Sequence, residues 1–131
     1  MPAPDSRSPD ETLLPHASQR RLETPVGPVI GASYRWQGGQ YCAIHTARGV
    51  VGCGIFDLAC ADVFSMAFAI ARGTPEHPLR EPEDLLEAQI VGVSAAALAQ
   101  GVRPGMTGLE AIGQMLAANQ SGPLAVTSST S

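Results

Sequence analysis

The stretch QYCAIHTARGVVGCGIFD, residues 40–57, decides how this chain folds. Two apolar runs, 40–47 and 50–56, flank Arg48-Gly49, and apolar runs around a two-residue turn predict a β-hairpin. A turn at that place pairs Ile44 with Cys53. Because alternate residues of a strand share a face, one face of the hairpin is apolar and is expected to lie in the core. This face carries Cys42, Ile44, Thr46, Val51, Cys53 and Ile55.

The opposite face of the predicted hairpin is poor in side chains. It carries Tyr41, Ala43, His45, Val50, Gly52, Gly54 and Phe56. Glycine within a strand often marks a place that another backbone or a ligand approaches closely. We therefore expect a flat surface over Ala43, Gly52 and Gly54, covered by a helix, a second subunit or a ligand.

The segment after the hairpin has two interpretations. Asp57 is suited to cap a helix, and residues 58–72 are rich in alanine and end at Gly73, which predicts a single helix. Its polar residues would form one narrow stripe, so a second subunit is expected to cover part of it. The alternative is a short helix followed by a strand, because large and small residues alternate over 64–71.

The outer parts of the chain set the domain boundaries. A length of 131 residues suits one domain. Residues 1–21 mix proline, serine and charge without hydrophobic periodicity, and residues 119–131 are mostly polar, so both are predicted to be disordered tails. The domain is then residues 22–118, and its first segment, 22–36, contains prolines typical of an edge strand.

Local signals define the elements after residue 80. We predict a short helix at 82–87, a strand at 89–93, a helix at 95–100 capped by Ser94, and a last helix that starts at the capping box Thr107–Glu110. The inner stripe of this last helix is Leu109, Ile112, Met115 and Leu116. The predicted fold class is α+β, in two layers, with a small mixed sheet and a central hairpin backed by helices.

Two of these stretches resemble a known family. The elements GCGIFD at 52–57 and GVRPGMTGLEAIGQML at 101–116, with EDLLEA between them, are similar to the YunC-like family, known as domain of unknown function 1805. The residues that match its motifs are Cys53, Gly54, Asp57, Gly105, Met106, Thr107, Gly108 and Glu110. The resemblance covers about residues 41–116, with different spacing between the elements. It implies a two-layer α+β fold and no assigned reaction.

Composition excludes several classes of function. The formal net charge is −4 and the eight basic residues are scattered, so nucleic-acid binding is not expected. The sequence offers no apolar run long enough for a membrane span and no secretory signal at its start. Three cysteines without framework spacing indicate a reduced, cytoplasmic protein.

Cys53 is the first candidate nucleophile, with His45 or His77 as proton carrier and Asp57 as the residue that orients it. The predicted register places Cys53 and His45 on opposite faces. Free cysteine is also among the most buried residue types, so a core thiol is the preferred interpretation. His77 lies in a loop with nearby carboxylates, where a solvated connection is preferred over a site.

No metal site is predicted. Cys42, His45, Cys53 and Cys60 are the available ligands, but the Cys42-x-x-His45 spacing sends the two side chains to opposite faces of a strand. No cofactor is indicated. The preferred interpretation is a cytoplasmic homo-oligomer that binds a small ligand or a partner protein. The alternative is a small enzyme that uses Cys53 with a histidine and Asp57.

Overall fold

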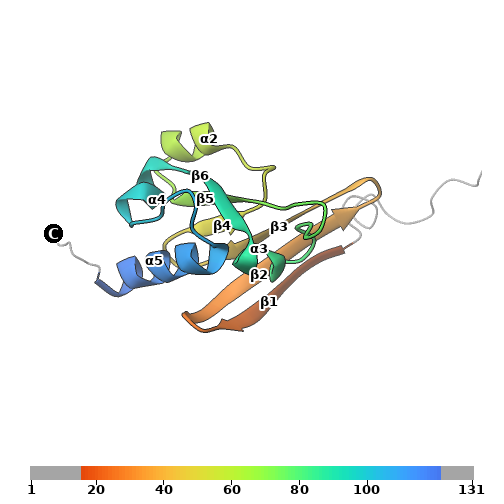
Figure 1. Cartoon of the computed structure of the whole chain (residues 1–131), viewed down its shortest axis with the longest axis horizontal. Coiled ribbons are helices and arrows are strands. Elements are labelled where there is room, and N and C mark those ends of the chain that lie inside the picture. The colour runs from red at the N-terminus through yellow and green to blue at the C-terminus, as the bar shows by residue number, and fades with distance from the viewer. Residues whose placement is uncertain (1–15, 122–131) are drawn as a thin grey trace, which may run out of the picture.

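The structure is a computed structural model that describes residues 16–121. Six strands form one sheet in the order β1-β2-β3-β4-β5-β6, all antiparallel to their neighbours except the parallel pair β4 and β5 (Figure 1). The strands are β1 His16–Thr24, β2 Gly27–Trp36, β3 Gly39–His45, β4 Val50–Gly52, β5 Phe68–Arg72 and β6 Gln89–Val93. The helices are α2 Leu58–Val63, α3 Asp84–Glu87, α4 Ala95–Ala99 and α5 Gly108–Ser121. The predicted α+β class with a mixed sheet is confirmed.

The core lies between one face of the sheet and α5 with α3. Its fully buried side chains come from every strand after β2 and from both of these helices. They include Cys42, Ile44, Val51, Ala69, Ala71, Leu85, Ile90, Ile112 and Met115. The helix α2 lies across the other face, where a Cβ on Gly92 would come within 2.8 Å of Leu58 Cδ1. None of the helices in residues 16–121 has the length and apolar character that crossing a bilayer needs.

The predicted single helix over 58–72 is wrong, and the alternative is correct. α2 ends at Val63, and Ser65 takes a φ of 56°, which is incompatible with a continuing helix. Residues 68–72 form β5, with Ala69 and Ala71 buried in the core. Alanine has a high helix propensity, but propensity is weak beside hydrogen bonding to strands on both sides and burial with a period of two.

The turn of the β3–β4 hairpin comes one residue earlier than predicted. The Thr46 N–H donates to Gly49 O at 2.8 Å, and the Gly49 N–H donates to Thr46 Oγ1 at 2.9 Å. Ala47 and Arg48 therefore form the two-residue loop. Gly49 lies outside it because it contacts α5: a Cβ there would be 2.8 Å from Met115 Sδ.

This difference moves the strand pairing by two residues. Ile44 pairs with Val51, and the Cys53 N–H donates to Cys42 O at 3.3 Å. A shift of two residues leaves each side chain on the same face, whereas a shift of one would reverse the faces. The predicted core face is therefore retained, except that Ile55 lies beyond the end of β4 and is exposed.

The expected flat surface on the reverse of the hairpin is filled by the chain itself. Phe56 folds back over Gly52, and its ring packs against Tyr41 and Phe68, with centroid separations of 6.0 and 4.8 Å. Ala43 is only 1% exposed. A side chain of the same chain therefore covers Gly52, where the sequence predicts a helix, a second subunit or a ligand.

Replacing Gly52 with alanine is expected to destabilise the fold by about 1–3 kcal/mol, because the added methyl group would collide with the Phe56 ring. The free energy of unfolding in urea measures the effect. Gly54 is the matched control, since a Cβ there meets no atom within 4 Å. Equal values for Gly52→Ala and Gly54→Ala would contradict this packing.

The first strand begins earlier than the predicted boundary at Leu22. β1 starts at His16 and pairs with the full length of β2, and Ser18 Oγ lies 2.9 Å from Ser33 Oγ. Leu22 is the one hydrophobic core residue that β1 supplies, so the strand lacks a visible apolar alternation. The rest of the predicted tails, residues 1–15 and 122–131, lies outside the described residues, and α5 extends to Ser121, past the predicted end at 118.

Elements predicted from capping signals match the structure closely. Ser94 caps α4, and β6 has the predicted bounds. At the start of α5 the Thr107 N–H donates to Glu110 Oε1 at 2.9 Å and the Glu110 N–H donates to Thr107 Oγ1 at 3.1 Å, which is a reciprocal capping box.

Candidate thiol site

Cys42, in the middle of β3, faces Cys53, the first residue after β4. The two residues are opposite one another across the strands, and both side chains lie on the core face. Cys42 is 0% exposed, whereas Cys53 is half-buried. The two thiols are close enough for each to shift the pKa of the other, and neither is in a disulfide.

The contact between the two side chains shifts their pKa values in opposite directions. The hydrogen bond from Cys42 lowers the pKa of Cys53 to about 5, against the opposing effect of burial, and the Ile55 N–H adds a further hydrogen bond. The same contact, together with burial, raises the pKa of Cys42 far above that of an ordinary thiol. At neutral pH the Cys42 thiol therefore donates to a Cys53 thiolate, and the thiolate is the nucleophilic form of cysteine.

The other predicted site residues have different surroundings. Asp57 caps α2, with its Oδ1 accepting from the Ala59 N–H at 3.0 Å. His45 is exposed on the face of β3 opposite to the thiols. His77 lies in an exposed loop, where its backbone N–H donates to Thr74 O at 3.0 Å. The residue opposite Cys53 is Cys42, a partner that the predicted group of cysteine, histidine and aspartate does not include.

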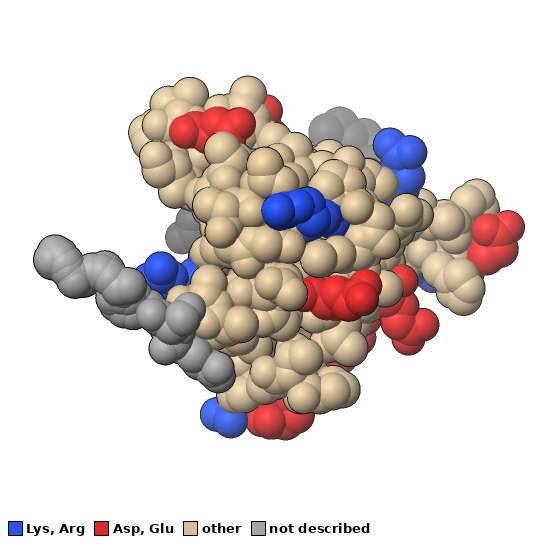
Figure 2. Space-filling model, turned by 60° about the vertical axis from the view of Figure 1, so that its left-hand side comes forward, with Lys and Arg blue, Asp and Glu red and all other residues tan. Residues whose placement is uncertain are grey.

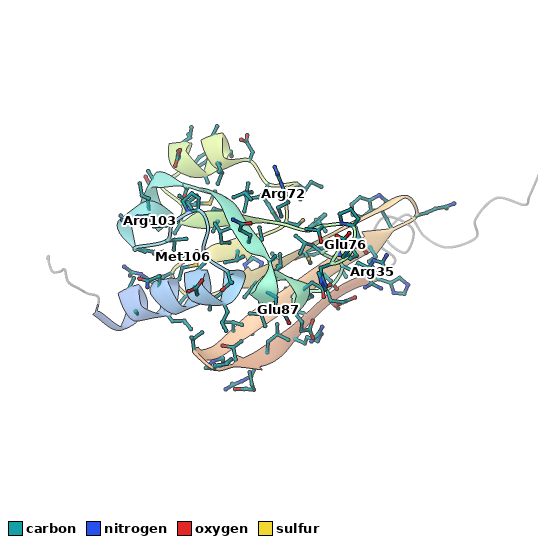
Figure 3. All side chains as sticks on the ribbon, viewed as in Figure 1. Arg35, Arg72, Glu76, Glu87, Arg103 and Met106 are labelled. Atoms are coloured by element: carbon teal, nitrogen blue, oxygen red, sulfur yellow. The ribbon has the colours of Figure 1, made fainter. Side chains whose placement is uncertain are left out.

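The loop between β5 and α3 is fixed to the sheet by several contacts. Leu79 packs against the same core cluster as Cys53, and Gln40 Nε2 donates to Leu79 O at 3.2 Å. Ion pairs of Arg35 with Glu81 and of Arg20 with Glu83 hold the loop to β1 and β2. Figure 3 shows Arg35 and Glu76 together at the end of the molecule that carries the β2–β3 hairpin tip.

Two surface hollows lie away from the thiols. The larger, about 710 Å³, is lined by residues 47–50 and 65–68 and by small side chains of α4. The smaller, about 420 Å³, is lined by His45 and Ile30 among others. Cys42 and Cys53 line neither hollow.

The pairing of Cys42 with Cys53 across the strands is not predicted from the sequence, because the predicted turn lies at Arg48-Gly49. That register pairs Cys42 with Ile55 and leaves the two thiols two residues apart. The signal that could have found the pair is Thr46, whose hydroxyl accepts from the Arg48 and Gly49 N–H groups and closes the turn at Ala47-Arg48. Cys60, the third cysteine, is exposed on α2.

Comparisons with known proteins agree with this fold and leave the chemistry open. A crystal structure of a protein of unknown function, TA1206 from Thermoplasma acidophilum, superposes with a TM-score of 0.66 over 76% of this chain and 93% of that one. The sequence identity is 16%, so the similarity shows the fold alone. A search of curated proteins finds no match. Residues 52–115 match the profile of the family described as domain of unknown function, DUF1805. The resemblance to DUF1805 that the sequence motifs predict is therefore confirmed over residues 52–115.

Proposed function

We propose that this domain carries out thiol chemistry, with Cys53 as the nucleophile and Cys42 as the group that holds the shared proton. The observation that carries the proposal is the placement of Cys42 and Cys53 opposite one another on the core face of the hairpin, where the Cys53 N–H donates to Cys42 O at 3.3 Å. A neutral thiol that donates to a thiolate stabilises the charged form without a histidine. Half-burial leaves Cys53 within reach of a small electrophile.

Alkylation of the native protein tests the proposal. At pH 6 a thiol with a pKa of about 5 is about 90% ionised, compared with about 0.3% for an ordinary cysteine. Lower basicity costs a factor of roughly 25 to 55 in intrinsic nucleophilicity. We therefore expect iodoacetamide to label Cys53 roughly tenfold faster than an ordinary thiol at pH 6, with a rate that is nearly constant from pH 6 to 8.

Peptide mapping with the Cys60→Ser variant assigns the labelled residue, because Cys60 is exposed and would otherwise react as well. The Cys53→Ser variant should lose the fast, pH-independent phase. A Cys53 thiol that reacts only when the protein unfolds would contradict the proposal and would restore the interpretation of Cys53 as a core residue.

A second candidate function is self-association, in which two copies of the chain meet through an exposed apolar patch formed by Val63, Phe64, Met66 and Leu98. These side chains are between 44% and 75% exposed. In Figure 2, which brings the α2 and α4 side of the molecule forward, most of the surface carries no charged residue. Exposed apolar patches of this kind often mark sites of protein association.

Sedimentation at micromolar concentration measures the association state. We expect a homo-oligomer that the double variant Val63→Ser, Phe64→Ser converts to monomer, while Ile30→Ser, at an exposed apolar site on β2, does not. A monomeric parent protein would contradict this candidate. Both candidates suit the cytoplasm, where thiols stay reduced.

A further inference from the structure

We propose that the Cys42–Cys53 pair reduces a small hydroperoxide and closes an internal disulfide between the two cysteines as it does so. This activity rests on the thiol chemistry proposed above and adds the class of substrate and the role of the second cysteine. Two features carry it: the opposed positions of the two residues and the difference in their burial.

The positions of the residues allow a disulfide with little change in the backbone. Cys42 and Cys53 are directly opposite on antiparallel strands, and the Cys53 N–H donates to Cys42 O at 3.3 Å. Opposed residues of such strands have Cα atoms about 4.5–5.5 Å apart, and disulfides span Cα separations of about 4.4–6.8 Å. Both side chains lie on the core face of the hairpin.

The difference in burial assigns the order of the two steps. Cys53 is half-buried and reaches solvent, whereas Cys42 is 0% exposed and can meet only Cys53. The oxidant therefore reacts first with Cys53. Cys42 then attacks the oxidised sulfur, which shields Cys53 from further oxidation.

The two steps balance with a hydroperoxide as the oxidant. The Cys53 thiolate attacks the terminal oxygen of ROOH, the O–O bond breaks, and the departing RO⁻ takes a proton from water to give ROH, leaving Cys53 as a sulfenic acid. The Cys42 sulfur then attacks the Cys53 sulfur. The S–O bond breaks, the hydroxide leaves with the Cys42 proton as water, and the S–S bond forms. An external thiol returns the pair to the reduced state by thiol–disulfide exchange.

The choice of oxidant follows from the partial burial of Cys53. Hydrogen peroxide is the smallest hydroperoxide, so it places the least steric demand on access to the thiol. The terminal oxygen of hydrogen peroxide needs no binding cavity, and Gly54, which follows Cys53, is exposed with no atom near its Cβ position. Hydrogen peroxide is therefore the probe for the experiment.

The experiment treats the reduced Cys60→Ser protein with one equivalent of hydrogen peroxide and follows thiol content, intact mass and a non-reducing peptide map. We expect both remaining thiols to disappear, the mass to fall by two hydrogens and a Cys42–Cys53 peptide to form. With Cys42→Ser added, the reaction should stop at a sulfenic acid on Cys53 that dimedone traps. With Cys53→Ser added, Cys42 should stay reduced.

Two results would overturn the inference. One is a Cys60→Ser protein that retains both thiols, and the other is one that gains oxygen at Cys53 without forming the disulfide. Iodoacetamide labelling of the same sample separates the two proposals. If Cys53 still reacts as a thiolate but no disulfide forms, the peroxide activity is wrong and the thiol chemistry stands. If Cys53 reacts with neither reagent, both are wrong.

Discussion

Replacing Cys42 with alanine is expected to slow alkylation of Cys53 roughly tenfold at pH 6 and to move the midpoint of its pH profile upward, from about 5 toward the value near 8.5 of an ordinary cysteine. The first cause of the low pKa of Cys53 is the hydrogen bond from Cys42, and alanine removes the donor. Burial, which raises the pKa, would then be opposed only by backbone N–H groups. The sign is fixed by the charge: a thiolate that loses a donor takes up its proton at higher pH.

Cys42→Ser is the matched control for this prediction. A serine hydroxyl still donates a hydrogen bond, so the midpoint should stay well below that of the alanine variant, although the disulfide can no longer form. Circular dichroism establishes that each variant is folded, which matters because residue 42 is fully buried. A pH profile that is unchanged in Cys42→Ala would show that Cys42 does not set the ionisation of Cys53.

Replacing Ser94 with alanine is expected to destabilise the fold by about 2–4 kcal/mol, the largest effect on stability that we predict for a single hydroxyl in this chain. Ser94 is 0% exposed. Its Oγ donates to Met66 O at 2.7 Å and accepts from the Phe68 N–H at 2.9 Å and from the Ala97 N–H at 3.3 Å. The substitution removes a helix cap and also leaves backbone groups at the start of β5 without this partner.

The free energy of unfolding in urea measures this loss, and Asp57→Ala serves as the comparison. Asp57 also caps a helix, but the Ala59 N–H that it binds is exposed and can form a hydrogen bond with water instead. Replacing Asp57 with alanine should therefore cost only about 1 kcal/mol. A Ser94→Ala cost no greater than that of Asp57→Ala would mean that the hydroxyl does not hold β5 to α4.

The parts of the fold that could be predicted are those fixed by neighbours in the sequence. Ser94, Thr107 and Glu110 bind backbone groups within three residues, and these contacts need no knowledge of the rest of the molecule. Residues 64–72 could not be assigned in this way. Their alanines favour a helix locally, whereas hydrogen bonds to β4 and β6, distant in the sequence, make them a strand.

The candidate site shows a similar division. The assignment of Cys53 to the core face is correct because the error in register is two residues, and the side chains of a strand return to the same face every two residues. The residue opposite Cys53 is predicted wrongly because of the same error, since a contact across two strands depends on the absolute register. His45 and Asp57 are near Cys53 in the sequence, but His45 lies on the opposite face of β3 and Asp57 caps α2.

The aromatic rings packed on the reverse of the hairpin include an intrinsic fluorophore, Trp36. Trp36 is the single tryptophan of the chain, and its ring meets Tyr41 edge-on at 5.7 Å between centroids. Tyr41 in turn contacts Phe56, three residues after Cys53. Indole emission is sensitive to the polarity around the ring, so a rearrangement of residues 53–56 that displaces Phe56 would be transmitted to Trp36 through one intervening side chain. Steady-state fluorescence of Trp36 therefore reports on the packing of residues 53–56 without a label and without substitution of any residue.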